Sequence, residues 1–142
     1  MRSVRVWGEL LRIEEAVVES VRVEAGEIVV TVRPHARTTR RCGVCGRRAP
    51  GFDQGHGRRR WRTFDVGTRR AYLEAAAPRV RCRVHAVVVA RLPWARHGAG
   101  HTRGFDDLVA WFATRMSKTA VARYLRLGWD TVGQIIARVM AD

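Results

Sequence analysis

The sequence predicts an α+β fold, and three observations support that prediction. Two apolar stretches flank a turn-like pair near the amino terminus, Gly, Pro and Arg recur through the middle of the chain, and apolar residues repeat at helical spacing after residue 102. We therefore expect an N-terminal β-hairpin region at residues 1–34, a small antiparallel β domain at 35–96 and a trihelical domain at 97–142.

The hairpin is expected from two short apolar stretches. Residues 16–24 partly alternate between apolar and polar side chains, and a second strand-like stretch, 27–33, follows the pair Ala25-Gly26. Pro34 ends the second strand because proline brings no backbone donor to a sheet. The earlier apolar stretch, Trp7 to Ile13, fits either a helical turn or part of a strand, and both interpretations stay open.

Short antiparallel strands are expected between His35 and Pro93, where the helical signal is weak. Strand-like pieces occur at residues 60–66, 70–76 and 86–92. The sequence Asp65-Val66-Gly67-Thr68 predicts a turn that joins the first two pieces as a hairpin.

The middle of the chain also carries the charge excess. The 142 residues have a formal net charge of +14, and residues 35–104 hold seventeen arginines against three acidic residues. Arginine presents a planar fork that suits phosphates, and its clustering near Trp61, Tyr72 and Trp94 favours a nucleic-acid surface. The alternative is a soluble surface with a basic bias.

Three cysteines cannot all pair within one chain, so metal ligation is the better account of them. Cys42 and Cys45 are two residues apart beside small glycines, and Cys82 and His85 repeat that spacing. Four such donors make a closed tetrahedral zinc site of the structural kind, with no open position for a substrate. Two alternatives remain: the cysteines are buried small hydrophobes, or the fourth ligand is another histidine, namely His35, His56, His97 or His101.

After the glycine-rich connector at 93–101, the apolar period becomes helical. Thr102 can cap a first helix that carries Phe105, Leu108, Val109 and Phe112 at i, i+3, i+4 and i+7. On its own, this pattern fits a core helix of any bundle.

Two further helices and a tight turn predict a helix-turn-helix. Ser117 can cap a helix at 118–125, the turn is Arg126-Leu127-Gly128, and a last helix follows at 129–140. Arg126 stands where such turns commonly have glycine. The polar face of the last helix fits a recognition helix in the major groove. It carries Asp130, Thr131, Gly133, Gln134 and Arg138. An ordinary trihelical bundle is the alternative.

The order of these features resembles the ISL-three family of bacterial insertion-sequence transposases. The resemblance rests on the hairpin, Cys42-x-x-Cys45, Arg60-Trp61-Arg62 with Asp65, Cys82-x-x-His85, Pro93-Trp94-Ala95 and the helices from Thr102 onward. It implies a zinc-binding segment with Cys42, Cys45, Cys82 and His85 at the ligand positions, and a helix-turn-helix at 117–140. In that family both bind element DNA, while a later acidic-triad domain performs strand transfer. That domain has no counterpart here, so we expect no catalytic residues in this sequence. We also expect this sequence to be one part of a longer one.

The leading functional hypothesis is DNA binding at transposon ends, without cleavage. Phosphate contacts are expected from Arg58, Arg59, Arg60, Arg62 and Arg69, with Lys118 as a further DNA contact, and base contacts from the polar face of the last helix. The expected cofactor is structural Zn²⁺, and the expected partners are duplex DNA and either a second copy or a full-length transposase. Because no apolar stretch is long enough for a membrane span or a secretory leader, we expect a cytoplasmic, nucleoid-associated protein.

Three other functions are weighed against it. An RNA-associated zinc-ribbon protein would stack unpaired bases on Trp61 and Tyr72. A DNA-binding transcriptional regulator would use the same helix-turn-helix. A nuclease built on His97 and His101 is disfavoured, because Gly98 and Gly100 preclude a stable helical pair.

Overall fold

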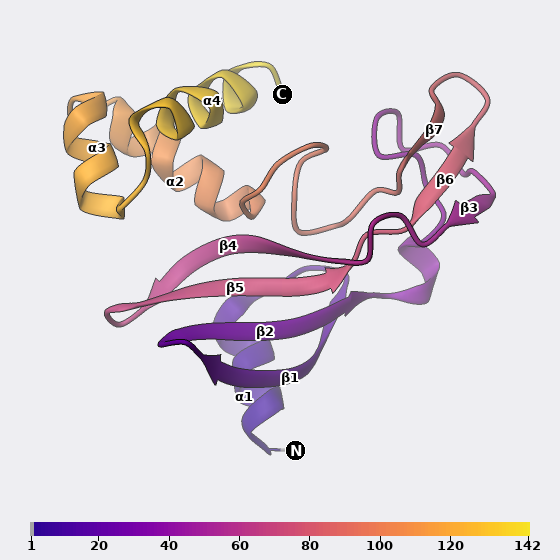
Figure 1. Cartoon of the computed structure of the whole chain (residues 1–142), viewed down its shortest axis with the longest axis horizontal. Helices are drawn as coiled ribbons and strands as arrows, with labels where there is room; N and C mark the ends of the chain where they lie inside the picture. The colour runs from indigo at the N-terminus through magenta and orange to yellow at the C-terminus, as the bar shows by residue number, and fades with distance from the viewer. Residues whose placement is uncertain (1) are drawn as a thin grey trace. The chain divides into compact units, whose positions relative to one another are not determined.

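The computed structural model describes residues 2–142, which divide into one unit up to Thr102 and another from Arg103 to Asp142 (Figure 1). The first unit contains one α-helix, one 3-10 helix and seven strands, and the second contains three α-helices. The predicted α+β fold is confirmed. The predicted three-part division stays a prediction, although residues from its first two parts share one sheet.

The amino-terminal elements are α1 (Arg2–Leu11), β1 (Ala16–Glu24) and β2 (Glu27–Pro34). The stretch from Trp7 to Ile13, which the sequence left undecided between helix and strand, is mostly helical. Trp7 and Leu11 pack against the core of the sheet. The predicted hairpin is present. Ala25 and Gly26 have φ of 51° and 78°, and two consecutive positive φ values are typical of a tight turn whose twist matches the strands.

The hairpin belongs to a four-stranded sheet with β4 (Arg58–Val66) and β5 (Arg69–Ala76), in the order β1-β2-β5-β4. β4 and β5 form the predicted second hairpin around Gly67. β2 and β5 pair in parallel, from Ile28 opposite Ala71 to Thr31 opposite Glu74. The expectation that β4 and β5 are strands around the metal was therefore wrong, because they extend the hairpin sheet instead.

A separate three-stranded antiparallel sheet forms the ribbon. Its strands are β3 (Gly51–Asp53), β6 (Arg79–Cys82) and β7 (Ala86–Val89), in the order β3-β6-β7, and a 3-10 helix, η1 (Ala36–Thr38), precedes them. An isolated bridge pairs Cys42 with Ala90. The chain that leaves Cys45 returns through strands to Cys82, beside the first pair of cysteines, as the 36 residues between the two motifs require.

Two tryptophans form the centre of the larger sheet's core. Trp61 and Trp94 are 1% and 4% exposed, and their rings meet edge to face with centroids 5.6 Å apart. The expectation that they lie at a nucleic-acid surface was wrong, because both are buried in the core. The RNA alternative loses Trp61, one of its two stacking residues, for the same reason, while Tyr72 is half-buried.

The carboxy-terminal unit consists of α2 (Arg103–Ala113), α3 (Lys118–Leu125) and α4 (Trp129–Met140). Its core contains the predicted apolar residues. Ser117 caps α3, with its Oγ accepting a hydrogen bond of 3.1 Å from the backbone N–H of Ala120. Arg126 takes the left-handed conformation that glycine commonly supplies, with φ 57° and ψ 50°. The turn therefore has the expected geometry despite the arginine.

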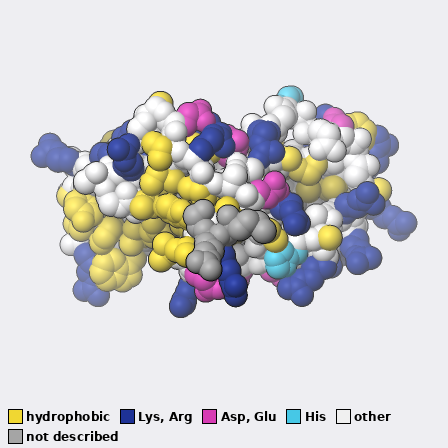
Figure 2. All heavy atoms as spheres, turned by 90° about the horizontal axis from the view of Figure 1, so that it is seen from below, with side chains coloured by type: hydrophobic (Ala, Val, Ile, Leu, Met, Phe, Trp, Pro, Cys, Tyr) yellow, Lys and Arg dark blue, Asp and Glu magenta, His cyan; other side chains and the backbone are white. Residues whose placement is uncertain are grey.

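Apolar side chains are exposed along α1. Val6 and Leu10 are 54% and 71% exposed. Figure 2 looks at the molecule from the side on which α1 lies, and hydrophobic side chains gather on that face. Among the described residues, no helix is both long and apolar enough to cross a membrane.

Candidate metal centre and nucleic-acid interface

The first knuckle is a tight turn at residues 42–46. The N–H of Gly46 donates to the carbonyl of Cys42 at 2.9 Å, and the N–H of Val44 points at the Cys42 sulfur at 3.4 Å. Gly43 has no room for a side chain: a Cβ there would stand 2.5 Å from Nδ1 of His97 and closer still to a backbone oxygen. The small residues of the motif thus let the chain fold closely around its two sulfurs.

The second knuckle is the connection between β6 and β7. Cys82 pairs with Ala86 across this hairpin, and Ala86 adopts a positive φ of 58°. The bend turns His85 back toward Cys82, so that His85 Nδ1 lies 3.7 Å from Cys82 Sγ.

The two knuckles bring four donor atoms together. The ligand atoms of Cys42, Cys45, Cys82 and His85 all lie within 4.8 Å of one another. The Cys45 and Cys82 sulfurs are 3.8 Å apart, and Cys42 Sγ lies 3.6 Å from His85 Nδ1. A tetrahedral zinc ion requires edges of about 3.8 Å between two sulfurs and about 3.6 Å between sulfur and nitrogen, given its usual bond lengths.

The four side chains therefore fit a four-coordinate zinc ion. The other histidines proposed as alternative fourth ligands lie outside this cluster, which is the one found among the described residues.

Two cysteines of the cluster have pKa values shifted in opposite directions. The backbone amides of His85 and Val84, together with the His85 ring, lower the pKa of Cys82 to about 6. For Cys45, a backbone hydrogen bond with Arg47 favours the thiolate, but desolvation and the neighbouring thiols outweigh it and raise the pKa. Adjacent thiolates repel each other, and a bound cation would relieve that repulsion.

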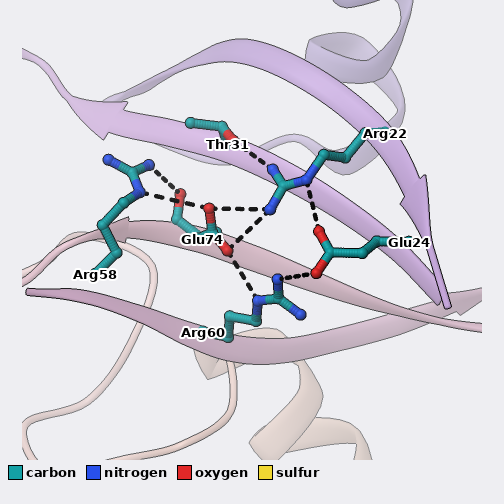
Figure 3. Close-up of polar contacts among 6 residues, drawn as sticks. All are labelled: Arg22, Glu24, Thr31, Arg58, Arg60 and Glu74. Carbon is teal, nitrogen blue, oxygen red and sulfur yellow. Dashed lines mark hydrogen bonds and ion pairs between the residues drawn. The ribbon is translucent and has the colours of Figure 1, made fainter.

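Two of the arginines expected to hold phosphates, Arg58 and Arg60, surround one carboxylate together with Arg22. Glu74 accepts from Arg22 at 3.1 Å, from Arg60 at 2.8 Å and from Arg58 at 3.4 Å (Figure 3). Partial burial opposes ionisation of Glu74, but its hydrogen bonds with Arg60 and Arg22 outweigh burial and lower its pKa. Arg60 also reaches Glu24 at 2.9 Å. Arg58 and Arg60 are thus already engaged within the protein.

The remaining expected phosphate contacts also have internal partners. The Arg59 guanidinium lies 5.3 Å from the Trp61 ring centroid, and Arg62 is 5% exposed and 3.2 Å from Asp65. Arg69 donates to the carbonyl of Gly26 at 2.9 Å. Their assignment to phosphates stays a prediction, and the buried Arg62 fits it least.

On α4, the side chains of the expected recognition face have different surroundings. Asp130 and Gln134 are exposed and Thr131 is half-buried. Arg138 donates to both oxygens of Asp106, at 3.1 and 3.2 Å, and Asp106 is fully buried. Arg138 therefore fastens α4 to α2, which leaves it less suited to reading bases.

Lys118 sits on an aromatic ring that sequence reasoning missed. Its Nζ lies 3.3 Å from the ring centroid of Trp129, which is 55% exposed. A Cβ on Gly133 would stand 2.6 Å from the same Nζ, so the absence of a side chain at Gly133 makes room for the lysine. The helical spacing from Trp129 to Gly133 could have shown that both lie on one side of α4, but not that Lys118 covers them.

Two family descriptions match adjoining parts of the chain. Residues 38–85, which include all four candidate ligands, match the zinc-finger of transposase IS204/IS1001/IS1096/IS1165. Residues 90–140 match the helix-turn-helix domain of transposase family ISL3. These are the two regions that the order of motifs predicted.

Curated relatives agree with this assignment. The transposase for insertion sequence element IS1557 of Mycobacterium tuberculosis, in strains CDC 1551 / Oshkosh and ATCC 25618 / H37Rv, is 49% identical over 149 residues. The match covers 100% of this chain and 34% of the relative, so the chain spans about a third of its length. No solved structure matches the chain. Over its zinc-finger and helix-turn-helix regions, the chain therefore belongs to the ISL3 family of transposases.

Proposed function

We propose that this chain is the DNA-binding region of a transposase and that it recognises the ends of the insertion sequence. The observation that carries the proposal is the division of α4 into two faces. Val132 and Ile135 are fully buried, whereas Asp130 and Gln134 are exposed. A helix held in this way by a preceding helix and a tight turn presents polar side chains to the base edges of the major groove.

Within this proposal, Gln134 is the strongest candidate for reading a base. A glutamine amide both donates and accepts hydrogen bonds and can pair with the two exposed groups of an adenine. Thr131 lies one turn earlier on α4. Lys118, steadied by Trp129 at the start of the same surface, supplies a charge for a neighbouring phosphate.

The four-ligand cluster has a structural role in this proposal. A bound zinc ion would supply the cross-link that holds the two knuckles together, and with all four positions filled by protein it has no place for a substrate. Strand transfer is assigned to the remainder of the transposase, because the curated relatives extend well beyond the region that this chain matches.

The test compares duplex DNA carrying an insertion end with a random duplex of equal length. We expect Gln134→Ala to weaken binding to the end by about 1–3 kcal/mol and to leave the random duplex unaffected, since a bidentate base contact contributes to discrimination. Gln54→Ala, a matched change at an exposed glutamine of the other unit, is expected to alter neither. Equal affinity of the unmodified chain for both duplexes would contradict the proposal.

A further inference from the structure

Exposed arginines gather where the four-stranded sheet meets the ribbon. β2 and β5 run parallel and therefore end at the same edge of the sheet, from which the chain passes to the ribbon (Figure 1). Two hollows of about 440 and 520 Å³ open there, and they share Ala36, Thr39 and Arg40. They adjoin each other and form one depression within the first unit.

This depression, here named the arginine groove, has basic side chains along it. Six exposed arginines line it: Arg33, Arg37, Arg40, Arg48, Arg58 and Arg91. Glu19 also lines the groove, and it lies 3.6 Å from Arg33 in an exposed pair. Buried apolar residues, including Val32, Ala75 and Leu92, form part of the lining as well.

The groove shares Arg58 with the cluster around Glu74, and its Arg33 faces Glu19, but its other four arginines differ from these. Within the described part of the chain, Arg37, Arg40, Arg48 and Arg91 make no ion pair. Like charges held together without counter-charges repel one another in the free protein, and a bound polyanion relieves that repulsion. The uncompensated charge therefore points to an anionic partner.

The backbone around the first knuckle holds these arginines in place. Arg40 has a left-handed φ of 57°, and its carbonyl accepts from the N–H of Ala49 at 2.9 Å. The N–H of Arg91 donates to the carbonyl of Arg41 at 2.8 Å. Because a non-glycine residue adopts a left-handed φ only at a cost, the surrounding hydrogen bonds must fix this geometry.

We propose that the arginine groove binds the sugar-phosphate backbone of duplex DNA, separately from the face of α4 that reads bases. The inference rests on the proposed function and adds a second DNA contact to it. Guanidinium groups donate paired N–H bonds to phosphate oxygens, and the apolar lining accommodates the sugars between phosphates. These contacts read no sequence, so the groove raises affinity for every duplex alike.

The first test is the double variant Arg37→Gln/Arg48→Gln in the full chain. At 0.15 M salt we expect roughly 30-fold weaker binding to both the insertion end and a random duplex, and a salt slope less steep by about 1.8, because each phosphate contact contributes about 0.9. The matched control, Arg5→Gln/Arg12→Gln, removes the same charge from exposed positions in and just after α1 and is expected to change binding less than threefold. Arg40→Gln/Arg91→Gln provides an independent repeat, and circular dichroism checks that each variant is folded.

Several results would overturn the groove and leave the proposed function intact. One is an equal loss of duplex affinity in the groove variants and in the control. Another is a loss of affinity that affects the insertion end and not the random duplex. In contrast, Gln134→Ala is expected to reduce the preference for the insertion end without changing the salt slope. If the unmodified chain bound no duplex at low salt, both proposals would fall together.

Discussion

The ribbon and the helix-turn-helix differ in what their cores contain. Buried residues of the ribbon are small, namely Cys42, Ala49, Val80, Cys82 and Ala90. The helical unit buries larger side chains, including Phe105, Leu125 and Ile135. Apolar burial contributes roughly 25 cal/mol per Å², so the ribbon gains little from its core, whereas the helices hold together by packing. Under the proposed function, we therefore expect the ribbon to depend on metal ligation. Specific residues in each region test this contrast.

Loss of one metal ligand is expected to have the largest effect. His85→Ala removes a donor from the ribbon, and structural zinc contributes on the order of 10–16 kcal/mol of apparent binding energy. We expect nuclear magnetic resonance signals from the knuckles and the ribbon strands, residues 42–53 and 79–90, to collapse while those of α2 to α4 persist. His56→Ala, at an exposed histidine outside the cluster, is the control and is expected to leave every signal in place. Survival of the ribbon in His85→Ala would contradict the ligand set.

The second prediction reverses the comparison by destabilising the helical unit alone. Asp106→Asn removes the charge that Arg138 contacts with both of its bonds. We expect the free energy of unfolding to fall by about 2 kcal/mol, because Arg138 loses its counter-charge, while its side chain, which is 23% exposed, keeps part of its contact with water. Denaturant unfolding followed at 222 nm measures the loss. The exposed neighbour Asp107→Asn is expected to change stability by less than about 0.5 kcal/mol, and an equal effect in both variants would argue against the pair.

The third prediction separates stability from binding within α4. Gly133→Ala should stabilise the helix by up to about 1 kcal/mol, because alanine has the higher helix propensity. The same methyl group displaces Lys118 from its position over Trp129, so duplex affinity should fall even as the melting temperature rises. Gly8→Ala in α1, where nothing lies within 4 Å of the added carbon, should leave affinity unchanged. Unaltered affinity in Gly133→Ala would remove Lys118 from the interface.

The smallest effect is expected at the turn between α3 and α4. Arg126→Gly relieves a left-handed arginine and should stabilise the unit by about 0.5–1 kcal/mol. Arg123→Gly, placed inside α3, should destabilise it by a similar amount because glycine has poor helix propensity. Thermal unfolding of the two variants checks that their stabilities change in opposite directions. A less stable Arg126→Gly would mean that the contacts of the arginine side chain stabilise the turn by more than its left-handed backbone destabilises it.

The helical unit could be predicted from the sequence because its signals are local. Ser117 caps a helix at 118–125, and the apolar spacing of the last helix depends on residues within two turns. The four metal ligands could also be proposed, because their spacing reflects the geometry of two knuckles. The choice of His85 over four other histidines needed the three-dimensional structure.

The long-range contacts could not be predicted in the same way. The parallel pairing of Ile28 with Ala71 joins segments separated by the whole first knuckle, and no local pattern encodes it. The arginines around Trp61 predict a surface residue, yet Trp61 is 1% exposed and packs in the core with Trp94, which lies far along the chain. The partners of Arg58 and Arg60 were missed for a similar reason, because Glu74 reaches them from the neighbouring strand.

The most direct test of the account is X-ray absorption at the zinc edge on the purified full chain, with metal content measured on the same sample. We expect one zinc per chain, coordinated by three sulfurs at about 2.3 Å and one nitrogen at about 2.0–2.1 Å. A chain without zinc, or a zinc ion bound by two sulfurs with oxygen ligands, would contradict the Cys42, Cys45, Cys82 and His85 centre on which the ribbon depends.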